Sequence, residues 1–165
     1  MSSALAIASV SYVLKDLLNN GIIASNVSGI TMGNVNVTAL PPDKIDVSAN
    51  EPSRLNLYLY RVSFNQGWKN ASFPSFDSRG DRVSNPPLAL DLHYLLTSYG
   101  NSELHMEILL GYGMQILHEK PVLARDEIRN SLLASATESS GILPEGLRLL
   151  STSGLAEQVE QIKII

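Results

Sequence analysis

Residues 54–70 read RLNLYLYRVSFNQGWKN, and residues 86–100 read PPLALDLHYLLTSYG. In both stretches apolar residues alternate along the chain, which is typical of β-strands because successive side chains of a strand point to opposite faces of a sheet. The loop between them, of roughly twenty residues, is longer than the about two to five residues that a hairpin needs. The two stretches therefore predict a pair of long strands joined by an extended loop.

The first of these strands is apolar on both faces. Its expected faces are Leu55, Leu57 and Leu59 on one side and Tyr58, Tyr60, Val62 and Phe64 on the other. A strand of this kind is covered on both sides, by helices or by a neighbouring subunit. The partner strand is expected to have a more polar second face. One face is expected to carry Leu88, Leu90, Leu92, Tyr94 and Leu96, and the other Ala89, Asp91, His93 and Leu95.

The loop between the strands carries three aromatic side chains, Trp68, Phe73 and Phe76, among polar residues. Aromatic residues are enriched at the centres of protein interfaces. They can equally fold back as a small core beneath their own loop, and the sequence leaves both interpretations open. We name Trp68, Phe73 and Phe76 as candidate contact residues.

The segment before these strands has helical spacing. Apolar residues from Val10 to Leu18 recur at intervals of three and four residues, with Ser9 on the polar side. Gly21 is expected to end this helix, because glycine adopts the left-handed backbone angles of a helix end without strain. A short alternating strand is expected over residues 35–39.

A second helix is expected over residues 101–120, with Asn101 or Ser102 as its cap. Gly111 and Gly113 lie inside it, and each costs about 1 kcal/mol relative to alanine in a helix. These two glycines therefore indicate close packing of that helix face on the sheet or on another chain.

The C-terminal part is expected to contain a short helix over residues 126–134 and a final strand over residues 159–165. The chain stops inside that strand, which indicates a fragment of a longer protein or a strand completed by a neighbouring chain. Ile162, Ile164 and Ile165 are therefore candidate interface residues at a sheet edge.

Composition narrows the possible classes. The chain has 165 residues, which fits one domain at ~100 to 200 residues per domain. Its formal charge is -4 and it has no basic run, so we expect no nucleic-acid partner. Lys15 and Asp16 interrupt the apolar N-terminus before the ~20 residues that a membrane span needs, so we expect no membrane partner. We predict a single α/β (α+β) domain over residues 1–165, with a central mixed or antiparallel sheet flanked by helices.

The sequence offers little for catalysis. Asp91 and His93 share a predicted strand face, but the nucleophile elbow of a hydrolase is missing and the chain has no cysteine. His105 and His118 are too far apart for the adjacent-turn spacing of a zinc motif, and no glycine-rich phosphate loop is present. We expect no enzyme, metal or cofactor; a small hydrolase built on Asp91 and His93 is the alternative.

Six stretches together resemble one known family. They are ALAIASVSYVLKDLL (4–18), PPDKI (41–45), EPSRLNLYLYRV (51–62), NQGWKN (65–70), PPLALDLHYLLTSYG (86–100) and LAEQVEQIKI (155–164). The chain resembles the cap, or tail-tube terminator, of extracellular contractile injection systems of the antifeeding-prophage and virulence-cassette type. The resemblance covers nearly the whole chain, and residues 86–100 are its most specific part.

This resemblance implies a phage tail-terminator-like α/β domain that forms a homohexamer ring at the end of the tube distal from the baseplate. There the ring stops the growth of the tube and the sheath, so the inner tube protein and the sheath protein are its implied partners. Such a protein is assembled in the bacterial cytoplasm and becomes part of a released extracellular particle. Family members usually run on past the final strand, so the chain looks like an N-terminal domain. A baseplate or tube adaptor of the same kind of particle is the alternative.

Overall fold

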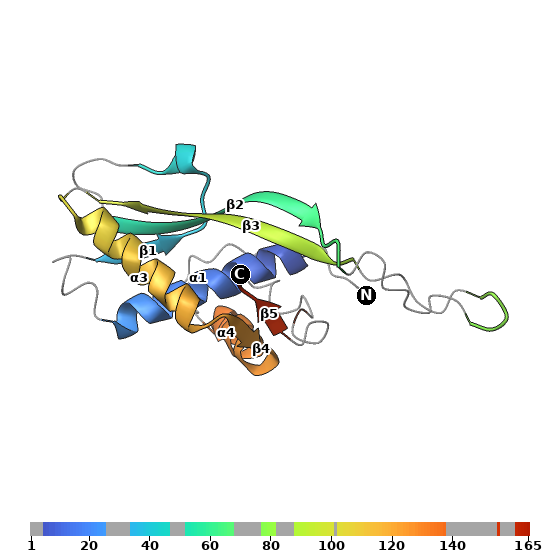
Figure 1. Cartoon of the computed structure of the whole chain (residues 1–165). Helices are drawn as coiled ribbons and strands as arrows, with labels where there is room; N and C mark the ends of the chain where they lie inside the picture. The colour runs from blue at the N-terminus through green and yellow to red at the C-terminus, as the bar shows by residue number, and fades with distance from the viewer. Residues whose placement is uncertain are drawn as a thin grey trace.

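The computed structural model describes residues 5–25, 34–46, 52–67, 77–81, 88–100, 102–137, 155 and 161–165, with the side chains of 134–137 excepted. Its elements are α1 (Ala6–Ala24), β1 (Val35–Thr38), the 3-10 turn η1 (Pro42–Lys44), β2 (Ser53–Phe64), β3 (Leu90–Tyr99), α3 (His105–Glu119), β4 (Val122–Ala124), α4 (Arg125–Thr137) and β5 (Gln161–Lys163). The strands β1, β2 and β3 form one layer, and the helices form a second layer against it (Figure 1). The fold is α+β, as the sequence predicted.

Helix α1 runs past the glycine that was expected to end it. Gly21 lies within the helix, which continues to Ala24. A Cβ on residue 21 would lie only 2.7 Å from Ile116 Cδ1, so the glycine serves the close approach of α1 to α3. Ser9 is fully buried, and its hydroxyl is satisfied there by donating to the Leu5 carbonyl of the preceding turn. The prediction of a helix end at Gly21 and of a polar position at Ser9 was wrong.

The three-stranded sheet is mixed. Strand β1 pairs with β2 in parallel, and β2 pairs with β3 antiparallel over the whole length of β3, from Arg54 opposite Tyr99 to Phe64 opposite Leu90. The register shifts between Leu59 and Arg61, which leaves Tyr60 as the extra residue of a β-bulge. The predicted pair of long strands is confirmed, and the bulge is new.

The bulge changes which side chains share a face. Leu57 lies opposite Leu96, and beyond the bulge Val62 lies opposite Leu92. Residues that pair across two strands lie on the same face, and every second residue of β3 lies on one face. Leu96, Leu92 and Leu90 therefore share a face, and so do their partners Leu57, Val62 and Phe64. The expectation that Val62 and Phe64 share a face with Tyr58 was wrong, because one inserted residue reverses the alternation.

Helix α3 packs on this face of the sheet. A Cβ on Gly113 would lie 3.0 Å from Leu55 Cδ2 and 3.2 Å from Leu96 Cδ2, so the glycine lets the helix backbone approach the strands. The helix begins at His105, after Leu104 at φ 63, and no side chain caps it. Ser102 contributes its carbonyl to the His105 N–H, and Asn101 lies outside the described residues.

The C-terminal elements form a second small sheet, in which β4 pairs antiparallel with β5. Strand β4 was not predicted, since three residues are too few for a visible alternation. At the start of α4, Glu127 Oε1 lies 2.6 Å from Lys120 Nζ and Oε2 accepts from the Ala124 N–H at 3.2 Å. The Lys120 ammonium, with the Ala124 amide, lowers the pKa of the Glu127 carboxyl.

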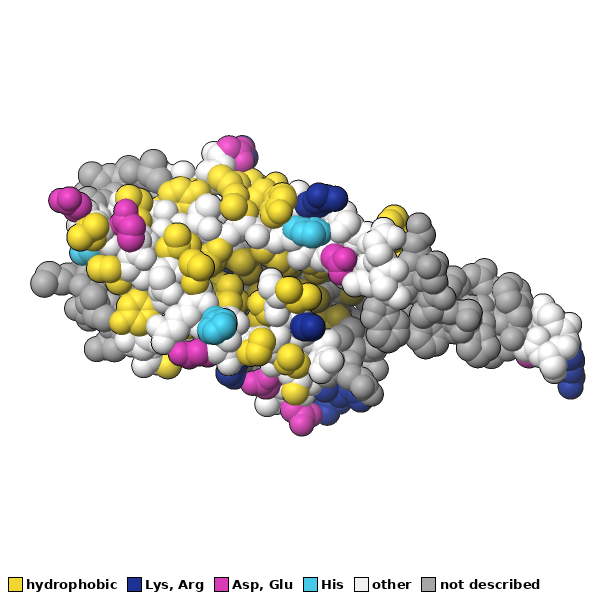
Figure 2. Space-filling model, in the orientation of Figure 1, with side chains coloured by type: hydrophobic (Ala, Val, Ile, Leu, Met, Phe, Trp, Pro, Cys, Tyr) yellow, Lys and Arg dark blue, Asp and Glu magenta, His cyan; other side chains and the backbone are white. Residues whose placement is uncertain are grey.

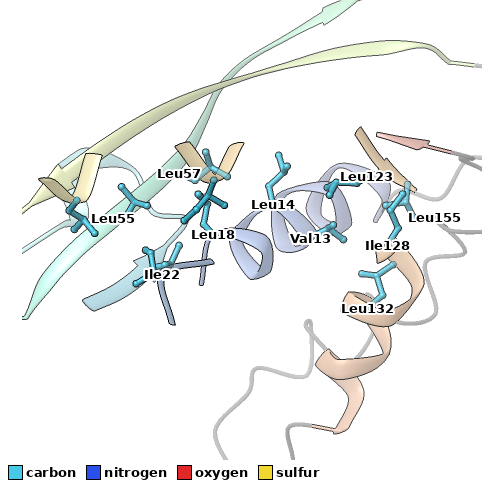
Figure 3. Close-up of a cluster of buried hydrophobic side chains, with 13 residues drawn as sticks. Val13, Leu14, Leu18, Ile22, Leu55, Leu57, Leu123, Ile128, Leu132 and Leu155 are labelled. Atoms are coloured by element: carbon cyan, nitrogen blue, oxygen red, sulfur yellow. The ribbon is translucent and has the colours of Figure 1, made fainter. Parts of the chain in front are cut away.

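The hydrophobic core extends along α1. Leu18 and Ile22 of α1 pack toward Leu55 and Leu57 of the sheet, whereas Val13 faces the C-terminal elements (Figure 3). That second part of the core contains Leu123, Ile128, Leu132 and Leu155. Helix α1 therefore ties the main sheet to the C-terminal unit through one continuous core.

A buried asparagine fixes the segment that follows β1. Asn56 of β2 is fully buried, and its Oδ1 accepts from the Leu40 N–H and the Thr38 hydroxyl, each at 2.9 Å. Its Nδ2 donates to the Leu40 carbonyl at 3.0 Å. Both backbone groups of Leu40 are thus satisfied by one side chain, which holds the start of the β1–β2 connection against the outer side of the sheet.

Candidate functional site

The outer face of the sheet, opposite α1 and α3, carries an exposed apolar patch. Tyr58 lies opposite Leu95 and Arg61 lies opposite His93, so these residues share that face. Tyr60 is 58% exposed and Leu95 43% exposed, although both lie in the middle of the strands. We call Tyr58, Tyr60, Arg61 and Leu95 the outer patch. Tyrosine and arginine are enriched at interface cores, which makes this surface suited to a protein partner.

The bulge produces this patch. It leaves Tyr60 unpaired in register with β3, and the Tyr60 ring instead meets the His93 ring at a centroid distance of 6.2 Å and an interplanar angle of 60°. The neighbouring apolar residues Val62 and Phe64 are turned to the helix side. The outer face therefore presents aromatic and charged side chains at this point.

A polar group adjoins the patch. His93 Nε2 lies 2.8 Å from Ser63 Oγ, and Asn65 Nδ2 donates to Asp91 Oδ1 at 2.7 Å. Asp91 and His93 do share a face, as predicted, but no hydrogen bond joins them. The serine–histidine pair therefore lacks the carboxylate that orients the imidazole in a nucleophilic triad. Its hydrogen bonds tie β2 to β3 across the ladder.

The exposed side of α3 is hollowed. Glu107, Ile108, Gly111, Tyr112 and Gln115 line a shallow depression, which we call the α3 depression. Gly111 is one of these lining residues, and a Cβ on it would meet no atom within 4 Å. Acidic side chains gather over the start of the helix (Figure 2). Of the two glycines that indicated close packing, Gly113 contacts the strands, and Gly111 has no such contact with the part of the chain that the structure describes.

The three aromatic residues predicted as loop contacts, Trp68, Phe73 and Phe76, lie outside the described residues. The described part of their loop is a tight turn over residues 77–81. Asp77 Oδ1 accepts from the N–H groups of Arg79 and Asp81 at 2.8 and 3.0 Å, and Gly80 has φ 85. This turn reverses the chain at the end of the loop farthest from the helices (Figure 1).

The three C-terminal isoleucines have different environments. Ile162 lies opposite Leu123 in the β4–β5 ladder and packs, with Ile164, against the core. The Ile164 N–H donates to the Pro121 carbonyl at 2.8 Å. Ile165 is exposed. The structure therefore uses Ile162 and Ile164 at least in part for the chain's own packing, and leaves Ile165 on the surface.

Sequence reasoning missed both surfaces described above, although one signal was present. Leucines occupy odd positions from Leu55 to Leu59, and the next aliphatic or phenyl side chains, Val62 and Phe64, occupy even ones. Such a change of phase inside one strand is the pattern that a single inserted residue produces. Read in this way, the sequence would have placed Tyr60 at a bulge.

Two kinds of site are not found in the part of the chain that the structure describes. Within those residues, no group of three or more His, Asp or Glu side chains is placed to hold a metal ion. None of the helices there is both long and apolar enough to cross a membrane.

The described residues thus form an α+β domain whose sheet exposes an aromatic patch on one face. A protein-family model described as the Pvc16 N-terminal domain matches residues 9–165. The chain belongs to this family, which places it among the structural proteins of phage-tail-like injection systems. Searches of curated proteins and of solved structures gave no match.

Proposed function

We propose that this chain forms a ring that caps the tube of a phage-tail-like contractile injection system and terminates its polymerisation. The outer patch is the observation that carries the proposal. On the helix side of the sheet Leu55 and Leu57 are buried under the helices, although Val62 and Phe64 at the far end of β2 are exposed. The other side exposes Tyr60 and Leu95 in mid-strand, and we propose that a partner protein covers this surface in an assembled particle. Membership of the Pvc16 N-terminal domain family indicates which kind of particle that is.

In this proposal the ring is a homohexamer of the chain, and its other partners are the inner tube protein and the sheath protein. One face of the ring matches the last layer of the tube, and the other face offers no surface on which a further layer can start. Assembly takes place in the bacterial cytoplasm, and the ring leaves with the released particle. No catalytic residue, cofactor, nucleic acid or membrane takes part.

The test compares particles expressed with and without this protein by negative-stain electron microscopy. The proposal expects a broad distribution of tube lengths and an open end in its absence, and restoration of the normal length by the wild-type chain. Restoration should fail with Tyr60→Glu, which puts a charge in the outer patch. Leu133→Glu, at an exposed leucine of α4, is the matched control and should restore it.

A baseplate or tube adaptor is the second candidate, because it would need a similar uncovered surface. Labelling the protein within the particle separates the two. A label at the end distal from the baseplate supports the cap. A label at the baseplate, or tube lengths and ends that are unchanged without the protein, would reject the cap and favour the adaptor.

A further inference from the structure

We infer that the outer patch of one copy packs into the α3 depression of a second copy of this chain, with Arg61 of one copy facing Glu107 of the other. The inference rests on the proposed self-assembly and adds the two surfaces that carry it. The occupant of each surface is thus a second copy of the same chain, in a head-to-tail arrangement.

The positions of the two surfaces require two copies. The outer patch lies on the face of the sheet away from the helices. Helix α3 lies on the opposite face (Figure 1) and contacts the strands at Gly113. Gly111, which lines the depression, is on the other side of the helix, where a Cβ would meet no atom within 4 Å. The sheet therefore separates the two surfaces within one molecule. One chain cannot bring them together, and a second copy can.

Gly111 gives independent support for a close approach at the depression. A glycine inside a helix costs about 1 kcal/mol relative to alanine. Gly21 and Gly113 each allow a close contact within the chain, but nothing lies within 4 Å of a Cβ on Gly111. Among the residues that the structure describes, nothing therefore packs on this position. The absence of a side chain at Gly111 leaves room in the depression for an outside group such as the Tyr60 ring.

The charges of the two surfaces are complementary. Arg61 is an exposed residue of the outer patch and forms no ion pair with any described residue. Glu107 is exposed in the depression and, within the same described part, has none either. Asp91, which lies on the outer face opposite Ser63, accepts a hydrogen bond from Asn65. Arg61 is thus available to a carboxylate of another copy.

A contact between two different surfaces of the same chain repeats from copy to copy. Such heterologous contacts build a closed ring when the rotation per subunit closes, and an open filament when it does not. The pairing of the outer patch with the α3 depression is therefore a geometry from which a ring forms, with every subunit using both surfaces.

The test is a charge exchange measured by sedimentation velocity on the full chain. Arg61→Glu sets two carboxylates against each other at the contact, and Glu107→Arg sets two guanidinium groups against each other, so each variant alone should associate at least tenfold more weakly than the wild type. An equimolar mixture of the two variants should recover association, because contacts between unlike variants can then join opposite charges. The double variant should recover it too. Arg79→Glu, with the same charge change in the turn over residues 77–81, is the control for net charge.

A second variant addresses the depression. Gly111→Trp fills the depression from a position with open space around it, so the monomer should fold with an unchanged far-UV circular dichroism spectrum and should associate at least tenfold more weakly. Association of both single charge variants at wild-type strength, or weak association that the mixture does not restore, would overturn the inference. If the single charge variants fail this test but still cap particles at normal length, the proposed function stands and only the inferred contact is rejected. If the wild-type chain stays monomeric and its deletion leaves tube lengths unchanged, both the inferred contact and the proposed cap function are rejected.

Discussion

Gly21 of α1 and Ile116 of α3 meet so closely that a Cβ on residue 21 would lie 2.7 Å from Ile116 Cδ1 and 2.8 Å from Cγ1. Gly21→Ala should therefore destabilise the protein, even though alanine is the better helix former. Overpacking of this kind costs about 1 to 3 kcal/mol. Urea denaturation followed by circular dichroism measures the free energy of unfolding and so tests this prediction.

The control for this prediction shortens the opposing side chain. In an Ile116→Ala background the collision is removed, so Gly21→Ala should then be neutral or stabilising, and the two changes should not be additive. Equal effects of Gly21→Ala in both backgrounds would show that the helix contact is not the cause.

Gly111→Ala should have the opposite sign to Gly21→Ala. The new methyl group meets no atom within 4 Å, and replacing a helical glycine by alanine gains about 0.5 to 1 kcal/mol. We expect the free energy of unfolding of the monomer to rise by about that amount. A loss of stability would mean that the chain itself packs on this position.

The long strands could be predicted from the sequence because alternation is a local property of the chain. Whether a face is covered is not local. The doubly apolar pattern of β2 indicated two covered faces, by helices or by a neighbouring subunit. Within the described residues, α1 and α3 cover one face at Leu55 and Leu57 but leave Val62 and Phe64 exposed, and Tyr60 on the other face is exposed too. The end of α1 was predicted wrongly for a similar reason. Gly21 serves a close contact with Ile116, a residue far away in the sequence, and does not end the helix.

The sequence predicted that aromatic side chains form a contact surface, but it did not predict where that surface lies. Exposed aromatic side chains were expected on the loop, at Trp68, Phe73 and Phe76, and those three residues stay a prediction. The outer patch depends on a β-bulge, and the sequence has no glycine or proline at that position to indicate one. The α3 depression depends on Gly111 lying on the side of the helix away from the sheet. Helical spacing alone gave no reason to separate Gly111 from Gly113.

Asn56→Ala should destabilise the protein by about 1 to 3 kcal/mol, because it leaves the N–H and the carbonyl of Leu40 without their side-chain partner. Thr38→Val removes only the hydroxyl that donates to Asn56 Oδ1 and should cost about 1 kcal/mol or less. Urea denaturation of both variants gives the comparison. Equal costs would show that the backbone of Leu40 does not depend on Asn56.

Tyr94 should make the protein sensitive to alkali. Burial raises the pKa of its phenol above 10.0, and the hydrogen bond to Ser11 Oγ at 2.8 Å lowers that pKa in part. The native chain therefore keeps a proton that the unfolded chain releases, so the contribution of Tyr94 to stability is fully present below about pH 10 and is lost as the pH rises through the native pKa.

Tyr94→Phe should cost about 1 kcal/mol at pH 7, by losing the hydrogen bond, and should flatten the fall in stability above pH 10. Ser11→Ala should steepen that fall, because it removes the partner that lowers the pKa. Unfolding free energies measured from pH 8 to pH 11 give the three slopes, and an unchanged slope in Tyr94→Phe would assign the alkaline sensitivity to another group.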